Sequence, residues 1–160
     1  MNSLRICGIT VLTVIGLAAA SAAQQDKSSV VTMAASKFVT PAGFPTCNKT
    51  AVQHGDPTTG PSVILTQLTK GCFTPWHWHH TNEGGVVVSG RIKLELKGEA
   101  PQYLVAGDYF YNPSKHPHQT TCVSDCLVSI TSDSARDVHY IDSDGKEISP
   151  EEALKAASKP

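Results

Sequence analysis

The sequence has little net charge and no internal repetition. Lys and Arg total 13 and Asp and Glu total 14, which gives a formal net charge of −1. A field this weak does not attract nucleic acid or anionic lipid, so we expect neither partner. No repeat of fixed period and no low-complexity segment is visible, which argues against a solenoid. A chain of 160 residues fits one compact domain with tails.

The sequence also lacks an apolar run long enough for a comfortable membrane span of about 20 residues. Its longest run is Ile6 to Ala20, which follows a single charge at Arg5 and ends in the small residues 21–23. This pattern predicts a secretory signal peptide over residues 1–23, cleaved after Ala23. We therefore expect an exported protein, periplasmic or secreted, without a stable membrane anchor. An uncleaved anchor is the alternative.

Cleavage at that position leaves an even number of cysteines, namely Cys47, Cys72, Cys122 and Cys126. Four cysteines allow three complete pairings, and an oxidising compartment allows the bonds to persist. Only a short turn separates Cys122 from Cys126, so we predict a bridge there, with Cys47 and Cys72 left to pair. A closed zinc site of Cys122, Cys126 and two histidines is the competing interpretation.

Short β-rich runs separated by Gly, Pro, Asn and Asp dominate the chain from Phe38 onward. The expected strands are residues 62–69, 85–88, 91–96, 102–105, 109–111 and 127–131. Regular short strands with turn signals predict an all-β sandwich or barrel. Arg91 to Leu96 alternates charged with apolar residues, as a strand with one buried face does.

The two ends of the chain differ from this rhythm. Residues 24–35 are polar or small, which predicts a flexible leader before a barrel over residues 36–141. Residues 142–160 should contain a hairpin turn at Asp144-Gly145 and a short helix. Ser149 as N-cap and Pro150 at the first helical position predict that this helix covers residues 150–158.

Histidines gather in the segment from Trp76 to Glu83. Because side chains alternate along a strand, His77, His79 and Thr81 should share one face, joined by Glu83 if the register continues. Trp76, Trp78 and His80 should face the other way. His118, after the turn at Asn112-Pro113, could bring a third imidazole. Neutral imidazoles and a carboxylate suit a divalent transition metal and leave coordination positions open.

The spacing of these residues resembles the cupin superfamily. Its first motif, G-x5-H-x-H-x3-E-x6-G, is matched without a gap by Gly71, His77, His79, Glu83 and Gly90. Its second motif, G-x5-P-x-G-x2-H-x3-N, is matched by Gly107, Pro113 and His118, with Lys115 and Cys122 replacing the usual glycine and asparagine. The resemblance implies a single double-stranded β-helix, or jelly-roll barrel. It also implies one divalent metal ion bound by His77, His79, Glu83 and His118.

The resemblance implies a protein that binds a metal ion and also binds or converts a small molecule, but it does not identify that molecule. We expect a dioxygenase-like enzyme that uses Fe, Mn, Ni, Cu or Zn, with Glu83 as ligand and catalytic proton acceptor; isomerisation or hydrolysis would use the same residues. The alternative is a non-catalytic sensor or carrier, and a metal-free structural cupin is a weaker third. A homodimer is left open. We expect His80 and His116 at the rim, and His54 and His139 at the surface.

Overall fold

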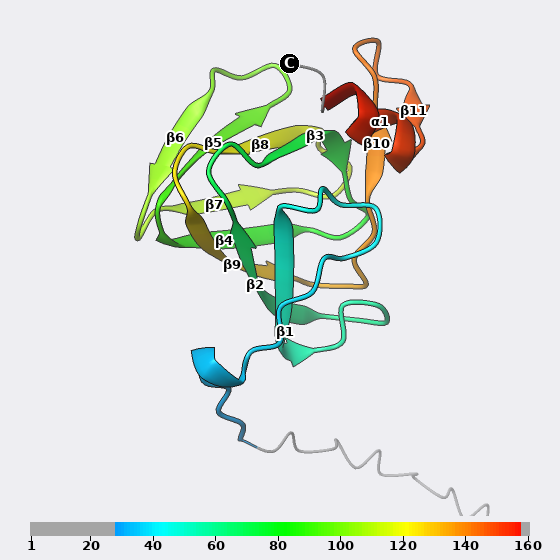
Figure 1. Cartoon of the computed structure of the whole chain (residues 1–160). Helices are drawn as coiled ribbons and strands as arrows, with labels where there is room; N and C mark the ends of the chain where they lie inside the picture. The colour runs from blue at the N-terminus through cyan, green and yellow to red at the C-terminus, as the bar shows by residue number, and fades with distance from the viewer. Residues whose placement is uncertain (1–27, 158–160) are drawn as a thin grey trace, which may run out of the picture. The chain divides into compact units, whose positions relative to one another are not determined.

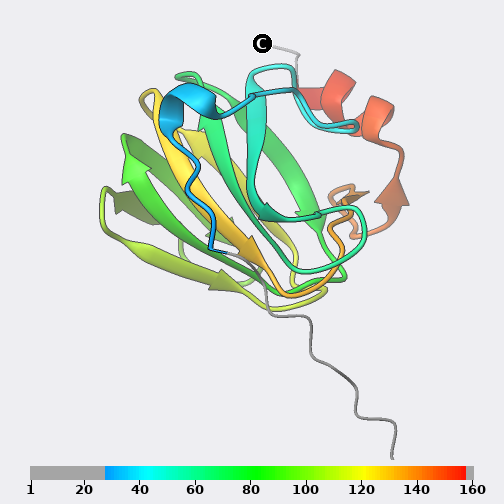
Figure 2. The same ribbon diagram turned by 90° about the horizontal axis from the view of Figure 1, so that it is seen from below.

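The chain folds into two antiparallel β-sheets that enclose a common interior (Figures 1 and 2). The computed structural model describes residues 28–157, so the predicted signal peptide and the start of the leader lie outside the described residues. The strands are β1 (Asn48–Gly55), β2 (Ser62–Leu68), β3 (Phe73–Trp78), β4 (Glu83–Ser89), β5 (Arg91–Leu96), β6 (Gln102–Val105), β7 (Tyr109–Asn112), β8 (His118–Cys122), β9 (Cys126–Ser132), β10 (His139–Ile141) and β11 (Glu147–Ile148). One turn of 3-10 helix, η1 (Met33–Ala35), precedes them, and the helix α1 (Pro150–Ala157) follows. The predicted all-β jelly-roll barrel with a short C-terminal helix is confirmed.

Successive strands mostly lie in different sheets, and the exceptions are the antiparallel pairs β1–β2, β5–β6 and β10–β11. One sheet has the order β1-β2-β9-β4-β7 and the other the order β11-β10-β3-β8-β5-β6. Consequently β3 and β4, neighbours in sequence, belong to different sheets, and the chain crosses between them at residues 79–82. This crossover places the two halves of the first motif on facing walls of the barrel.

The core lies between the sheets and follows the alternation of the strands. Ile92 and Leu94 of β5 are buried, whereas the preceding Arg91 is exposed, as the two-residue period of a strand predicts. Val87 and Val128 complete the centre from the other sheet. Removal of each such side chain from water contributes roughly 1.5–3 kcal/mol, which holds the sheets face to face.

Two turns next to the motifs depend on backbone conformations in the left-handed region. Gly90 has a φ of 82°, and a Cβ there would lie 2.2 Å from the carbonyl oxygen of Asp125. Lys115 has a φ of 61°, the only positive φ of a non-glycine among residues 28–157. Lys115 therefore reproduces the turn that glycine usually makes, and its N–H donates to the carbonyl of His79 at 2.8 Å.

The C-terminal segment forms the expected hairpin and helix. β10 pairs antiparallel with β11, and Gly145 adopts a φ of 85° in the turn between them. Ser149 caps α1, since its hydroxyl accepts from the N–H of Glu152 at 3.2 Å. The helix is described as far as Ala157; residue 158, the end that the sequence predicts, lies outside the described residues.

Two disulfides join segments on the same side of the barrel. Cys47, just before β1, pairs with Cys72, and Cys122 at the end of β8 pairs with Cys126 at the start of β9. This is the pairing that the short turn between Cys122 and Cys126 predicts. The second bridge ties the two sheets together, because β8 and β9 lie in different sheets.

Candidate metal centre

Three strands bring the motif residues to one end of the barrel interior. His77 on β3 lies directly opposite His118 on β8 in the antiparallel register. His79 follows the end of β3, and Glu83 begins β4 on the facing sheet. The strand β3 ends at Trp78, so it does not itself continue to Glu83. The crossover nevertheless preserves the expected alternation, with His77, His79, Thr81 and Glu83 buried and His80 exposed.

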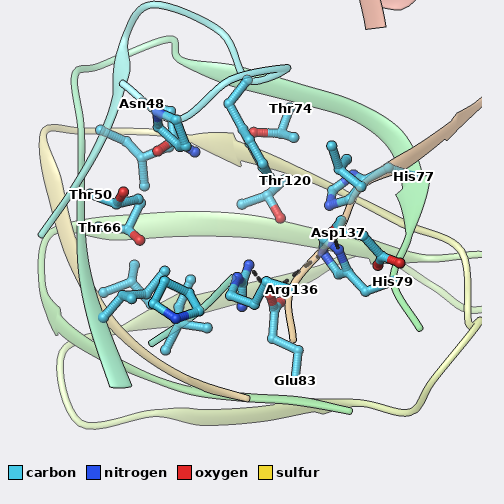
Figure 3. Close-up of a pocket in the computed structure, with 18 of the residues that line it drawn as sticks. Asn48, Thr50, Thr66, Thr74, His77, His79, Glu83, Thr120, Arg136 and Asp137 are labelled. Atoms are coloured by element: carbon cyan, nitrogen blue, oxygen red, sulfur yellow. Dashed lines mark hydrogen bonds and ion pairs between the residues drawn. The ribbon is translucent and has the colours of Figure 1, made fainter. Parts of the chain in front are cut away.

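The three imidazoles converge on a common point. One nitrogen from each of His77, His79 and His118 lies within 4.8 Å of the other two. The ring centroids of His77 and His118 are 4.2 Å apart, and those of His79 and His118 are 5.4 Å apart. Figure 3 shows His77 and His79 side by side at one end of the cavity, with Glu83 below them in this view.

Backbone carbonyls fix the tautomer of each imidazole. The Nδ1–H of His77 donates to Pro75 at 2.6 Å, that of His118 donates to His116 at 3.0 Å, and that of His79 donates to Asp137. A carbonyl can only accept, so the proton sits on Nδ1 and Nε2 keeps a free lone pair. Three oriented Nε2 lone pairs are a ready ligand set.

Burial keeps the imidazoles neutral. Loss of solvation lowers the pKa of His77 well below its usual value and lowers the pKa of His79 to about 4, against the opposing effect of Glu83. Burial lowers the pKa of His118 as well. Neutral imidazole is the form that binds a metal, so the site is in its ligating state at neutral pH.

Glu83 is a buried carboxylate with a cationic partner. Arg136 Nη2 lies 2.8 Å from its Oε2, and the amide of Asn112 donates to its Oε1 at 3.2 Å. Burial alone would raise the pKa of Glu83, but Arg136 and the nearby histidines lower it below its usual range. The carboxylate oxygens lie 3.6 Å from His79 Nε2 and 3.8 Å from His118 Nε2.

No sequence motif identified Arg136, Asn112 or the carbonyl of Asp137. A signal for Arg136 did exist, because a buried carboxylate needs a cation and the chain has only three arginines, at positions 5, 91 and 136. Arg5 falls in the predicted signal peptide and Arg91 on the exposed face of a strand. Arg136 was therefore the remaining candidate.

The donor set fits a divalent metal ion. His79 Nε2 is buried without a hydrogen-bond partner, although it points toward the other two imidazoles. A buried nitrogen lone pair without a donor is costly unless something binds it. Three imidazoles with an adjacent carboxylate suit Fe, Mn, Ni, Cu or Zn and do not select among them.

A cavity of about 400 Å³ opens onto these residues, within the size range of small-molecule sites. The histidines, Glu83 and Arg136 lie at one end. The walls are mainly apolar, formed by Ile64, Leu68, Ile92, Phe110, Val128 and Ile130. A ligand in this cavity would reach the triad along mainly apolar walls.

The remaining histidines lie apart from the triad. His80 and His139 both contact the carboxylate of Asp137, at 2.5 and 3.1 Å, on the outside of the barrel. His139 also stacks on Trp78, with ring centroids 4.1 Å apart. His116 is half-buried beside the second motif, and His54 is exposed.

The structure is thus an antiparallel double-sheet barrel with a buried histidine triad on its inner wall. Residues 64–131, which include both motifs in full, match the family described as "Cupin domain". Together with the fold of the structural matches below, this supports a protein of the cupin superfamily. Among the described residues, no helix is both long and apolar enough to cross a membrane.

Several characterised proteins are similar to this chain. The dimethylsulfoniopropionate lyase DddQ of Ruegeria pomeroyi is 29% identical over 59 residues, which are 37% of this chain and 29% of that lyase. Its crystal structure matches with a TM-score of 0.53 at 19% identity, over 62% of this chain and 57% of that one. This chain thus spans well under two thirds of the lyase.

Two solved structures match a larger share of both chains. The acetylacetone dioxygenase of Acinetobacter johnsonii has a TM-score of 0.59 at 17% identity and covers 96% of this chain and 97% of its own. The polyketide cyclase RemF of Streptomyces resistomycificus has a TM-score of 0.63 at 16% identity, with coverages of 72% and 87%. At these identities the matches establish the fold, which different chemistries share.

Proposed function

We propose that this chain is a metal-dependent enzyme for a small molecule, of dioxygenase-like type, with one divalent ion at His77, His79, Glu83 and His118. The observation that carries the proposal is the convergence of three neutral, oriented imidazoles on the wall of an apolar cavity. A bound ion would supply Lewis-acid chemistry and, if redox-active, electron transfer to a ligand at its open positions.

The charge balance of the site favours an anionic donor from the substrate. The three imidazoles are neutral, and Arg136 offsets the charge of Glu83. The four proposed ligands with Arg136 thus contribute no net charge, so the double charge of an ion would not be compensated by the protein. The carboxylate of Asp137 also lines the cavity, but it contacts His80 and His139. In a low-dielectric cavity the uncompensated charge of the ion favours an enolate, a diolate or a carboxylate.

The chain's own residues supply orientation and exclusion of water. The carbonyls of Pro75, Asp137 and His116 hold the rings, and Arg136 and Asn112 hold the carboxylate of Glu83. Ile64, Ile130 and Phe110 wall the cavity. Positioning of this kind lowers the cost of reaching a reactive geometry.

In the part of the chain that the structure describes, no carboxylate that lines the cavity has a raised pKa, as a carboxylate base at neutral pH would need, which favours oxidative over proton-transfer chemistry. Glu83 and Asp137 are the carboxylates among the described cavity-lining residues, and both pKa values are lowered, that of Asp137 to about 2. Glu83 is the proposed proton acceptor, and to serve as an effective base it would have to release Arg136. An isomerase or hydrolase would depend on that base more than a dioxygenase would.

Oxygen consumption tests the proposal. Protein loaded in turn with Fe(II), Mn(II), Ni(II) or Cu(II) is mixed with acetylacetone, a catechol or an α-hydroxy acid in an oxygen electrode. We expect uptake with at least one pair, none with the Zn(II)-loaded protein, and none with His118→Ala. Glu83→Gln should lose more turnover than metal.

The lowered pKa values of Glu83 and Asp137 are equally consistent with a second function, a sensor or carrier that binds without turnover. Calorimetric binding of the same compounds with no oxygen uptake and no product, for every metal, would establish this alternative in place of the enzyme.

We also propose that the protein is exported to the periplasm or secreted. The predicted signal peptide at residues 1–23 supports this, as do the two disulfides, which persist in oxidising compartments. Fractionation of cells and the intact mass of the mature protein test it. Export predicts a chain that begins at Gln24; a full-length chain in the cytosol would contradict it.

A further inference from the structure

A second group of polar side chains lies across the cavity from the histidine triad. Asn48 and Thr50 are two residues apart on β1 and share its inner face, and Thr66 on β2 is paired with Thr50 in the antiparallel register. All three line the cavity. Figure 3 shows them together on the side away from His77 and His79.

Two of these side chains are buried without a hydrogen-bond partner. Asn48 is 6% exposed and Thr66 is 3% exposed, yet Asn48 Oδ1 and Thr66 Oγ1 have no partner in the structure. Ser62 and Tyr140 also have a buried unpartnered hydroxyl, but neither lines the cavity. Buried polar atoms are nearly always satisfied, so a pair of unsatisfied atoms facing a cavity indicates a ligand group.

The chemistry of this end differs from that of the triad. Every ionisable side chain that lines the cavity belongs to the triad end: the three histidines, Glu83, Arg136 and Asp137. The Asn48 end is neutral, and between the two ends the cavity is lined by apolar side chains and by Thr74 and Thr120 (Figure 3). A ligand that fills the cavity therefore needs an anionic end, an apolar middle and a neutral hydrogen-bonding end.

We propose that Asn48 and Thr66 form a subsite for a neutral hydroxyl of the substrate, whose anionic end binds at the histidine triad. A hydroxyl both donates and accepts, so it satisfies the amide of Asn48 in either orientation and the hydroxyl of Thr66 together. The substrate class is then a linear or weakly branched hydroxy acid or hydroxy enol. The inference rests on the proposed function, because the metal holds the anionic end.

Matched ligand pairs test the subsite. Zn(II)-loaded protein is titrated calorimetrically with linear ω-hydroxy carboxylates from the butanoate to the octanoate, each beside the carboxylate in which a methyl replaces the hydroxyl. At the length that spans the cavity, the hydroxyl should tighten binding about tenfold. Both Thr66→Val and Asn48→Leu should reduce this preference to less than about twofold, with the methyl acid bound as before. Thr121→Val, whose side chain does not line the cavity, should keep the full preference.

The variants also report on the free protein. Thr66→Val removes an unsatisfied buried hydroxyl, so its melting temperature should rise or stay level, which shows that the variant folds. If no chain length shows a preference for the hydroxyl, the subsite is overturned; this is the result expected if a bound water occupies Asn48. A preference that persists in both variants would also overturn the subsite. Failure of both series to bind the Zn(II)-loaded protein would instead overturn the proposed function and the subsite with it.

Discussion

The contact between Arg136 and Glu83 determines the electrostatics of the site. Both side chains are largely buried, and the 2.8 Å pair leaves the carboxylate ionised. A buried ion pair adds little net stability, but loss of one partner leaves an uncompensated charge in the interior. Arg136 is therefore most important when no metal is bound, because a bound cation would also compensate Glu83.

Replacement of Arg136 by Gln should destabilise the metal-free protein by about 3–5 kcal/mol, the usual cost of breaking a buried pair. At a saturating concentration of divalent metal, the loss of unfolding free energy should be clearly smaller. Urea denaturation with a chelator and with metal measures both values. Arg91→Gln, an exposed position over the ring of Tyr103, is the matched control and should change little in either condition. An equal loss of stability for Arg136→Gln with and without metal would contradict the proposed position of the ion beside Glu83.

Asp137 links the outer histidines to the triad. Its carbonyl accepts from His79, and its carboxylate accepts from the N–H of His80 at 2.9 Å and contacts the rings of His80 and His139. Burial alone would raise the pKa of Asp137, but these hydrogen bonds lower it to about 2. Burial alone would lower the pKa of His139, but its contacts with Glu147 and Asp137 raise the pKa above its usual value.

The pH dependence of stability follows from these two shifts. The contribution of Asp137 is complete above its unfolded pKa of about 3.9 and is lost as the pH falls toward 2. The contribution of His139 is complete below its unfolded pKa of about 6.5 and is lost as the pH rises through its raised folded value. Their interaction should therefore be strongest between about pH 4 and pH 6.5.

Asp137→Asn keeps the carbonyl for His79 and removes the charge. Asp137→Asn should have a lower unfolding free energy than the unmodified protein. The difference should be greatest between about pH 4 and pH 6.5 and should become smaller below and above that range. Chemical denaturation across the pH range measures it, with Asp144→Asn, an exposed turn position, as the reference for loss of a carboxylate. A loss that does not vary with pH would show that the Asp137 and His139 charges do not interact.

At the residue scale, the sequence predicted the proposed ligands better than their surroundings. Motif spacing identified His77, His79, Glu83 and His118, and the structure brings them together. Their assignment as ligands stays a prediction. Arg136 could not be placed because the loop after β9 has no periodic pattern, and its contact with Glu83 spans 53 residues of sequence.

At the scale of elements, the crossover between β3 and β4 and the turn before β8 position the site. The turn contains Lys115 at a φ of 61°, a conformation that costs a residue with a Cβ roughly 1–2 kcal/mol. Its N–H bonds to the carbonyl of His79, so the strained turn connects the two motifs. Lys115 replaces the usual glycine of the second motif, and the structure shows that the lysine itself adopts the left-handed conformation of the turn.

Lys115→Gly should relieve this strain and raise the unfolding free energy by about 0.5–1 kcal/mol, after the entropic cost of glycine is subtracted. Lys49→Gly on β1 is the matched control and should lower it by a similar amount, because its backbone already has ordinary strand geometry. Urea denaturation of the two variants compares them directly. A stability loss in Lys115→Gly as large as that in Lys49→Gly would argue against the left-handed turn.

The strands that the sequence revealed are those with regular alternation or several branched residues, such as β2 and β5. β1 and β8 were not predicted as strands, because NKTAVQHG and HQTTC contain few apolar residues. These strands are stabilised by pairing with β2, β3 and β5, which is long-range information. The polar inner face of β1 now has an explanation, because it lines the cavity.

At the scale of the whole molecule, the barrel combines a polar centre with an apolar cavity. The histidines and Glu83 are buried at one end, and Asn48 and Thr66 are buried at the other. Among these groups His79 Nε2, Asn48 Oδ1 and Thr66 Oγ1 have no partner, which is unfavourable unless a ligand satisfies them. A bound metal and substrate would provide that compensation and stabilise the folded state by linkage.

The metal content of the purified protein tests this account most directly. Elemental analysis of protein prepared without added metal should give about one divalent ion per chain. His79→Ala and His118→Ala should lose it, whereas His54→Ala, an exposed position outside the site, should keep it. Full metal content in both His79→Ala and His118→Ala would contradict the central claim that the triad and Glu83 form one metal centre.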